Sequence, residues 1–176
     1  MEKMNFKELL IESDRLVLEP VSHSYAQVIF QEFTDEITRY MFPATPGCIY
    51  DVEIFIESSL HNMEAKSEVT FVILEKFQRE FLGVCGLHGL CSPDAPALGI
   101  WLKKSAHGHR YGREAIQRLV RWGKDQLAIK DMVYPCDRDN IASRKIAESL
   151  DGVVFRESQI QSLSGRVLNE LVYKIS

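Results

Sequence analysis

The sequence predicts a single α+β domain that spans residues 1–176 and is built on one mixed sheet. Two segments near the N-terminus carry apolar residues at helical spacing, and three short apolar runs follow them. In the last third, strand-like and helix-like segments alternate, which is typical of a sheet that is parallel in part. A length of 176 residues fits one domain, and no repeat or low-complexity linker offers a boundary.

The first half of the chain predicts two helices and four strands. Apolar residues recur every fourth position from Tyr25 to Ile37, which predicts one helix there, and a weaker pattern of this kind follows. Short, turn-rich links between the middle strands favour an antiparallel meander. We expect strands at residues 15–20, 69–74, 81–90 and 97–102, and helices at residues 23–40 and 51–65.

The second half contains the strongest helical pattern of the sequence, from Tyr111 to Leu127. An apolar stripe that begins at Gly112 runs opposite four basic residues, so one face of this helix belongs to the core. A strand at 131–136 and a short helix at 142–150 follow, and a closing hairpin joins 153–161 to 167–175.

Composition excludes several classes of protein. The chain is 45% hydrophobic, 26% charged and 10% aromatic, which excludes a mainly disordered protein. No apolar run reaches the ~20 residues that cross a bilayer, and the first residues lack a signal-peptide core, so we expect a cytoplasmic protein without membrane contact. The net charge of −4 argues against direct nucleic-acid binding. Four cysteines without CxxC spacing predict no metal site and reduced, mostly buried thiols: Cys48, Cys85, Cys91 and Cys136.

One segment reverses the overall charge. Residues 103–124 hold seven basic residues and one acid, which gives +6 in an acidic chain. In the same segment a strand ends, a small-residue turn with Gly108 follows, and a helix begins. The first turn of a helix leaves backbone N–H groups unpaired and favours an anion such as phosphate. A well-capped, solvated surface helix explains the pattern equally well.

Two further clusters carry weaker signals. The glycines at 83, 86 and 89 are not followed by a helix, so we interpret them as close backbone contacts within a strand rather than a nucleotide loop, and His88 beside them as structural. Asn140 is a suitable N-cap for the helix that starts after it. No Ser/His/Asp order or HExxH motif supports a hydrolase or a metalloenzyme.

Taken together, four segments resemble the GNAT superfamily of acyl-CoA-dependent N-acetyltransferases, and in it the RimJ/RimL-like branch of ribosomal-protein N-terminal acetyltransferases. The loop from His107 to Gly112 is similar to the family's Q/R-x-x-G-x-G/A pyrophosphate motif and is followed by Glu114-Ala115. The other three segments are Ser13–Leu18, Leu98–Leu102 and Asp139–Gly152. Their order and spacing cover nearly the whole chain.

The resemblance implies a GNAT-like fold, with a splayed, mostly antiparallel mixed sheet of about seven strands and about four helices. It also implies acetyl-CoA as co-substrate, with no metal. The backbone of Trp101, Leu102, Lys103 and Lys104 would pair with the pantetheine arm. The pyrophosphate would be held by the amides of His107, Gly108, His109, Arg110, Tyr111, Gly112 and Arg113. Asn140 and Ser143 would line the thioester end and are the candidate catalytic residues.

This chain departs from the family pattern at four positions. Arg110 replaces the first glycine of the loop, so either its backbone is left-handed, at a cost of roughly 1 kcal/mol or more, or the loop differs locally. His107 replaces Gln or Arg. Ala97 stands where many members have a Glu base, and Ala147 where they have a Tyr acid. Neither usual proton-transfer group is therefore present.

The missing base favours an acceptor amine of low pKa. Near pH 7.4 an α-amine with a pKa of about 7.8 is roughly a quarter neutral, whereas a lysine amine near 10.4 is only about 0.1% neutral. A protein N-terminal α-amine is thus the leading acceptor, and water held by Ser143 or Asn140, or His88 if it faces the cleft, would carry protons.

Two alternatives stay open. The acceptor is a small molecule such as a polyamine, an amino acid or an antibiotic, or the chain is an acyl-CoA-binding module without transfer activity. A polycation would need an acidic cleft built from Glu32, Asp35, Glu36, Asp51, Glu53 and Glu57. The exposed aromatics Phe30, Tyr40 and Phe42 serve either the core or an interface, in a monomer or a homodimer.

Overall fold

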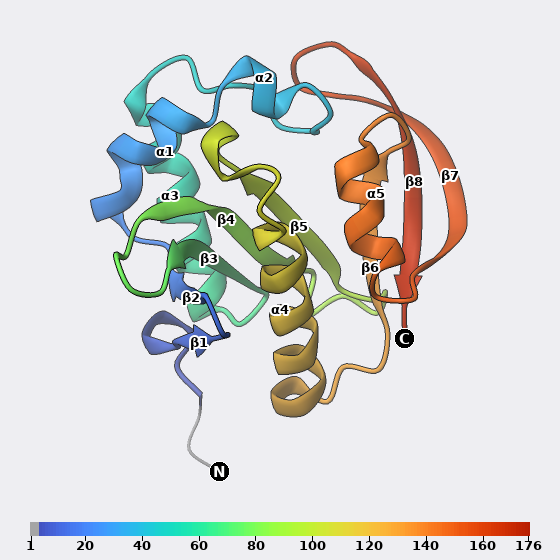
Figure 1. Ribbon diagram of the computed structural model, residues 1–176, viewed down its shortest axis with the longest axis horizontal. Helices are drawn as coiled ribbons and strands as arrows, with labels where there is room; N and C mark the ends of the chain where they lie inside the picture. Colours follow the sequence, from blue (N-terminus) through green and yellow to red (C-terminus); the bar gives the residue numbers. More distant parts are fainter. Residues whose placement is uncertain (1–3) are drawn as a thin grey trace.

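The computed structural model describes residues 4–176 and contains one sheet with strand order β1-β2-β3-β4-β5-β6-β8-β7 (Figure 1). Neighbouring strands are antiparallel except for β5 and β6, which are parallel. The strands are β1 (Ile11–Glu12), β2 (Leu16–Pro20), β3 (Glu68–Glu75), β4 (Phe81–His88), β5 (Ala97–Leu102), β6 (Met132–Asp137), β7 (Val153–Gln161) and β8 (Val167–Ile175). The predicted mixed, mostly antiparallel sheet is confirmed.

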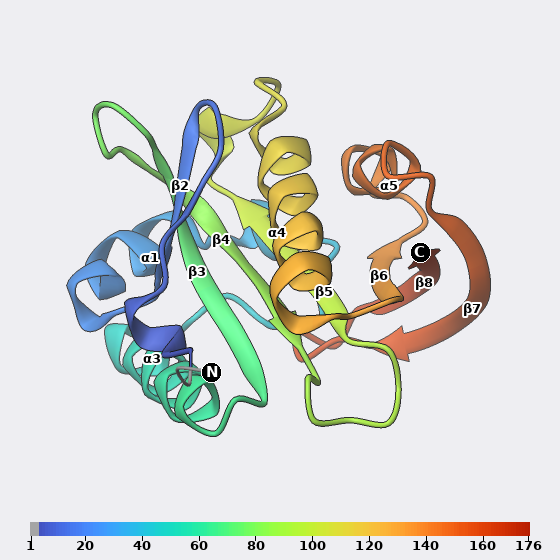
Figure 2. The same cartoon turned by 90° about the horizontal axis from the view of Figure 1, so that it is seen from below.

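Helices cover both faces of this sheet (Figure 2). One face carries α1 (Ala26–Glu32) and α3 (Ile49–Glu64), and the other carries α4 (Tyr111–Leu127) and α5 (Ile141–Glu148). The short α2 (Asp35–Thr38) lies at one end of the sheet (Figure 1). The α4 stripe is buried as expected, because Ala115, Ile116 and Leu119 are each 0% exposed. Gly112 of α4 lies close to the side chains of β5: a Cβ on this residue would lie 3.4 Å from Leu102 and 3.6 Å from Ile100.

The parting of β5 from β6 is the feature that positions the site. Their register has one partner pair, Ala97 opposite Val133, and beyond it the strands diverge towards their C-terminal ends. On β5 the residues alternate between the two faces. Trp101 packs against Phe33 on the face of α1, with ring centroids 4.7 Å apart, whereas Ile100 faces α4. Side chains of both faces of the sheet therefore border the place where the strands part.

Three expectations are wrong in detail. The helix expected at 23–40 is interrupted, because Phe33 leaves the helical region (φ −86, ψ 69) and Thr34 is extended; a 3-10 turn, η2 (His23–Tyr25), precedes α1. The two-residue strand β1 raises the number of strands among residues 4–176 to eight. Two of the four cysteines, Cys48 and Cys91, are exposed rather than buried.

No helix within residues 4–176 has the length and apolar character needed to cross a membrane.

The glycine-rich strand β4 depends on close backbone approach, as the sequence predicts. A Cβ on Gly83 would lie 2.1 Å from the Trp101 carbonyl oxygen on β5, a separation at which backbone must move. We expect Gly83→Ala to lower the free energy of unfolding by at least ~1–3 kcal/mol, because no flexible side chain can give way there. Urea denaturation measures this change. Gly47→Ala is the control, since its Cβ would meet only the Asp51 carboxylate at 3.5 Å; equal midpoints for the two variants would contradict the packing argument.

Candidate functional site

A cavity of about 240 Å³ lies where β5 and β6 part. Its lining comes from both faces of the sheet, with His88, Ala97 and Gly99 from β4 and β5, and Asn140 and Ser143 from the start of α5. The segment after α2 contributes Tyr40, Met41 and Phe42, so this loop closes one side of the cavity. The two predicted catalytic residues are therefore brought together in the lining of one cavity.

Asn140 and Ser143 are held by the start of α5. Asn140 is the N-cap, and its Oδ1 accepts a hydrogen bond from the Ser143 backbone N–H at 3.1 Å, which confirms the predicted cap. The Ser143 hydroxyl is 2.9 Å from the hydroxyl of Tyr134 on β6. Burial raises the pKa of Tyr134, and the hydrogen bond with Ser143 lowers it only in part. The pair thus holds exchangeable protons at the cavity wall.

The sequence analysis did not identify Tyr134 as a functional residue, because it lies in a segment that was predicted only as a strand. The family resemblance places a tyrosine acid at position 147. In this chain Ala147 is 0% exposed in the core and does not line the cavity. The hydroxyl of Tyr134 instead reaches α5 from β6. Cys136, on the same strand, also lines the cavity, and burial raises its pKa to about 11, so it is a neutral thiol near pH 7.

The loop between β5 and α4 has the backbone geometry of an anion site. Within residues 4–176, the backbone N–H groups of residues 108–113 make no hydrogen bond, and the first helical bond is donated by Glu114 to the Arg110 carbonyl. Gly108 has φ +83 with open space around it, so a ligand can approach the backbone. Free N–H groups at a helix start favour phosphate oxygens, so these residues fit a pyrophosphate.

Arg110 adopts the left-handed conformation that its replacement of glycine requires, with φ 63 and ψ 17. Its side chain and that of Arg113 are exposed and make no ion pair within residues 4–176. The lysines before the loop differ, because Lys103 pairs with Glu80 and Lys104 with Glu36. His107 also has a local partner: its Nε2 is 3.0 Å from the Leu102 carbonyl oxygen. The uncompensated positive charge at the loop therefore comes from the two arginines.

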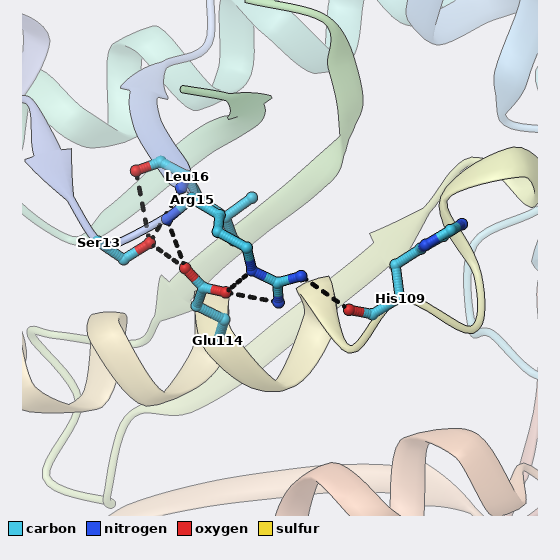
Figure 3. Close-up of polar contacts among 5 residues, drawn as sticks. All are labelled: Ser13, Arg15, Leu16, His109 and Glu114. Atoms are coloured by element: carbon cyan, nitrogen blue, oxygen red, sulfur yellow. Dashed lines mark hydrogen bonds and ion pairs between the residues drawn. The ribbon is translucent and has the colours of Figure 1, made fainter. Parts of the chain in front are cut away.

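A clamp from the N-terminal segment fixes this loop (Figure 3). Glu114, in the first turn of α4, accepts hydrogen bonds through Oε1 from the Ser13 hydroxyl at 2.7 Å and the Arg15 backbone N–H at 2.9 Å. The Arg15 guanidinium donates to Glu114 Oε2 at 2.7 Å and to the His109 carbonyl at 3.2 Å. It also lies over the Tyr111 ring, 4.7 Å from the centroid. Three residues of the anion loop and helix start are thus tied to one arginine.

The clamp keeps Glu114 ionised. Burial acts to raise the pKa of Glu114, but hydrogen bonds from Ser13 and Arg15 outweigh it, and the pKa is lowered. Only 19% of the Glu114 side chain is exposed, so solvent screens this pair less than a surface ion pair.

A larger open hollow of about 620 Å³ adjoins the cavity and shares Tyr40, Asp137 and Leu168 with it. Asp137 has a structural role, because its carboxylate accepts hydrogen bonds from the backbone N–H groups of Asp139 and Asn169. The remaining charged side chains of the hollow, two acids and two bases, are Asp35, Asp139, Arg39 and Arg166. The hollow is therefore of mixed charge.

Comparison with known proteins gives a consistent result. The family model of the acetyltransferase (GNAT) domain matches residues 15–153. The N-acetyltransferase YoaA of Bacillus subtilis (strain 168) is 24% identical over 139 residues, 78% of each chain. The solved structure of RimL, a ribosomal L7/L12 alpha-N-protein acetyltransferase in complex with coenzyme A, has a TM-score of 0.84, 19% identity and coverage of 94% of this chain and 97% of its own. The microcin C7 self-immunity acetyltransferase MccE, solved with acetyl-CoA and AMP, has a TM-score of 0.79 at 22% identity and 92% coverage of both chains.

We expect Glu114→Gln to weaken acetyl-CoA binding several-fold and to lower the free energy of unfolding by about 2 kcal/mol, because it removes the charge that holds Arg15. Calorimetric titration and urea denaturation measure these changes. Folding lowers the pKa of Glu114, so its stabilisation is present above the unfolded carboxyl pKa of about 4.3 and is lost as pH falls through the folded pKa.

The matched control for the clamp is Glu64→Gln, which breaks the exposed ion pair with Lys7 and should change little. If Glu114→Gln binds acetyl-CoA and unfolds like the Glu64→Gln control, the clamp does not position the loop.

Proposed function

Because the chain belongs to the GNAT family of acetyltransferases, it is an acetyl-CoA-dependent N-acetyltransferase, and we propose that its acceptor is the α-amine of a peptide or protein N-terminus. One observation carries the proposal. The cavity where β5 and β6 part is lined by residues of both faces of the sheet, so a thioester and an amine that approach from different sides can meet between Gly99 and Ser143.

We assign the cofactor arm and pyrophosphate to the edge of β5 and to the loop before α4. Acetyl-CoA supplies the activated acetyl group as a thioester. Backbone groups of residues 101–104 lie along its path; the Lys103 N–H already donates to the Leu82 carbonyl at 2.8 Å, so it is not free for the pantetheine arm. The free N–H groups of residues 108–113 face the phosphates, and Arg110 and Arg113 add charge.

The Tyr134–Ser143 pair is our candidate for returning a proton to the departing thiolate. Both hydroxyls are protonated near pH 7, they are 2.9 Å apart, and both line the cavity. A hydroxyl pair can pass one proton to sulfur and recover it from the amine nitrogen as the amide forms. This assignment also favours an active enzyme over a module that only binds acyl-CoA.

Three observations favour an N-terminal α-amine over a polycation. Three of the six acids named for an acidic cleft in the first helices have partners: Glu36 pairs with Lys104, Glu57 with His23, and Asp51 accepts from the backbone at the start of α3. The adjoining hollow is of mixed charge and suits a peptide backbone with polar side chains better than a polyamine. The solved relative RimL is an alpha-N-protein acetyltransferase by its description.

A free amino acid or a similar small zwitterion is the second candidate acceptor. Arg39 and Arg166 both line the hollow and make no ion pair within residues 4–176, so they are placed to receive a carboxylate. Thiol release from acetyl-CoA, measured against N-terminal peptides, their N-blocked forms, amino acids and polyamines, distinguishes the two. Turnover confined to polyamines would contradict the proposed acceptor.

We expect Arg113→Ala to weaken acetyl-CoA binding about tenfold at low salt, because a charge beside the phosphates is worth roughly 1.5 kcal/mol. Calorimetric titration at two salt concentrations checks this, since added salt should shrink the difference. Arg121→Ala is the control: it removes an equally exposed arginine two turns further along α4. Equal losses in both variants would place the phosphates elsewhere.

We expect Ser143→Ala and Tyr134→Phe each to lower kcat by ~10²-fold or more, because each interrupts the proton path. The affinity for acetyl-CoA, measured by calorimetry, should change much less than kcat. Ser149→Ala is the control, since that hydroxyl lies at the far end of α5 and bonds the Ile146 carbonyl. If both site variants keep the kcat of the control, the hydroxyl pair takes no part in proton transfer.

A further inference from the structure

We propose that His88, oriented by Glu68, is the base that takes the proton from the incoming ammonium group. This inference rests on the proposed function and deepens it, because it supplies the proton acceptor that Ala97 cannot provide. The sequence left two roles open for His88, a structural one and, if it faces the cleft, proton transfer; the residue lines the cavity, which favours the second.

His88 is the last residue of β4 and lines the cavity. In the sheet register it lies between Glu68 of β3 and Ala97 of β5, so the three residues form one row on the same face. Its Nδ1 is 3.2 Å from Glu68 Oε2. Within residues 4–176 its Nε2 has no hydrogen-bond partner, so one ring nitrogen is fixed and the other is open.

Two facing glycines make room for the imidazole. Gly86 and Gly99 are register partners on β4 and β5. A Cβ on Gly86 would lie 3.1 Å from His88 Nε2, and a Cβ on Gly99 would lie 3.3 Å from the same atom. The ring therefore lies over this glycine pair, with Nε2 directed along the sheet to Gly99, which itself lines the cavity. Any larger residue at either glycine would displace it.

The position of His88 compensates for the absence of a glutamate base at position 97. The resemblance puts a glutamate base at position 97, and His88 lies directly opposite that position on the neighbouring strand and the same face. The short Ala97 side chain leaves the cavity wall open beside the imidazole. A base from β4 thus acts where the usual base would come from β5.

Glu68 fits the role of a positioning residue. Its side chain is 18% exposed, and although burial acts to raise its pKa, hydrogen bonds led by the one with His88 lower it, so the carboxylate stays charged. A carboxylate at Nδ1 fixes the tautomer that leaves Nε2 unprotonated and stabilises the imidazolium after proton transfer. His88 is 44% exposed in its side chain, which gives the proton a route to solvent.

The steps balance as follows. The ammonium N–H bond breaks, its proton goes to His88 Nε2, and the neutral amine is left with a lone pair. That lone pair forms the C–N bond at the thioester carbonyl, and the C–S bond then breaks with its electrons on sulfur. The second proton leaves the nitrogen through the Tyr134–Ser143 pair and ends on the thiolate. The His88 proton passes to solvent, so the products are the amide, free CoA thiol and one proton.

The test uses amines that differ in pKa. His88→Ala should lower kcat by ~10²-fold or more with an alkyl amine that is charged at the assay pH. The loss should be several-fold smaller with an amine of low pKa, which is already neutral, and added imidazole should restore part of the rate. Glu68→Gln should lower kcat less than His88→Ala does. Acetyl-CoA affinity, measured by calorimetry, should stay within about twofold of wild type in both.

The matched control is His23→Ala. This variant removes a second His–Glu pair, in which His23 Nε2 lies 2.9 Å from Glu57 Oε2 on the surface, away from the cavity. It should keep the kcat of the wild type with every amine and should not respond to imidazole.

The outcomes distinguish a failure of the His88 proposal from a failure of the proposed acceptor. Wild-type activity in His88→Ala, or a loss of equal size for all amines without rescue by imidazole, would overturn the role of His88 while leaving the acetyltransferase intact. A wild-type chain that binds acetyl-CoA and acetylates no amine in the panel overturns the proposed acceptor, and the base assigned here with it.

Discussion

The parting of two parallel strands is the constraint on which the site depends. Between β5 and β6 the register holds one pair, Ala97 and Val133, while each strand stays fully paired with its other neighbour, β4 or β8. The facing edges beyond that pair lack a strand partner, and backbone groups in such a place require another partner. An extended ligand with amide groups of its own can supply one. Side chains of both faces of the sheet border the same gap, so acetyl donor and acceptor need not enter from one side.

The start of α4 adds an anion-binding backbone beside this gap, which suits a long anionic ligand. Its first turn presents free N–H groups directly after β5 ends, and a left-handed Arg110 sets the direction of the chain there. Left-handed backbone at a non-glycine residue has to be stabilised by its surroundings. The Arg15–Glu114 clamp provides this, because it holds the carbonyl of His109, the residue before Arg110, and the ring of Tyr111, the residue after it. A contact between segments about 100 residues apart thus preserves the loop geometry.

Sequence patterns predicted the elements whose burial is regular. The strand 97–102, the helix 111–127 and the hairpin 153–161 with 167–175 have the predicted bounds, because each shows a single unbroken period. The break between α1 and α2 was not predictable in this way, since Phe33 continues the helical period while its ring packs on Trp101 of a distant strand. The loop and Asn140 could be placed through local motifs. The proposed roles of Tyr134 and His88 could not be predicted from local motifs. Tyr134 depends on Ser143, which the packing of α5 brings near, and His88 depends on Glu68 and on the glycine pair at 86 and 99, which the sheet register brings near.

The two groups that we propose for proton transfer lie on opposite faces of the sheet, and this separation suits their chemistry. His88 shares a face with Ala97, Gly99 and Trp101, the face covered by α1 and α3, whereas the Tyr134 hydroxyl reaches α5 on the other face. A base and an acid in direct contact would exchange their proton with each other rather than with the substrates. In the proposed mechanism the base and the acid lie on either side of the gap, so the base would meet the amine and the acid the sulfur of the thioester. The opening in the sheet therefore does more than admit the ligand. It would keep apart a base that acts on the nitrogen and an acid that acts on the sulfur, the two atoms that bond in turn to the same carbonyl carbon.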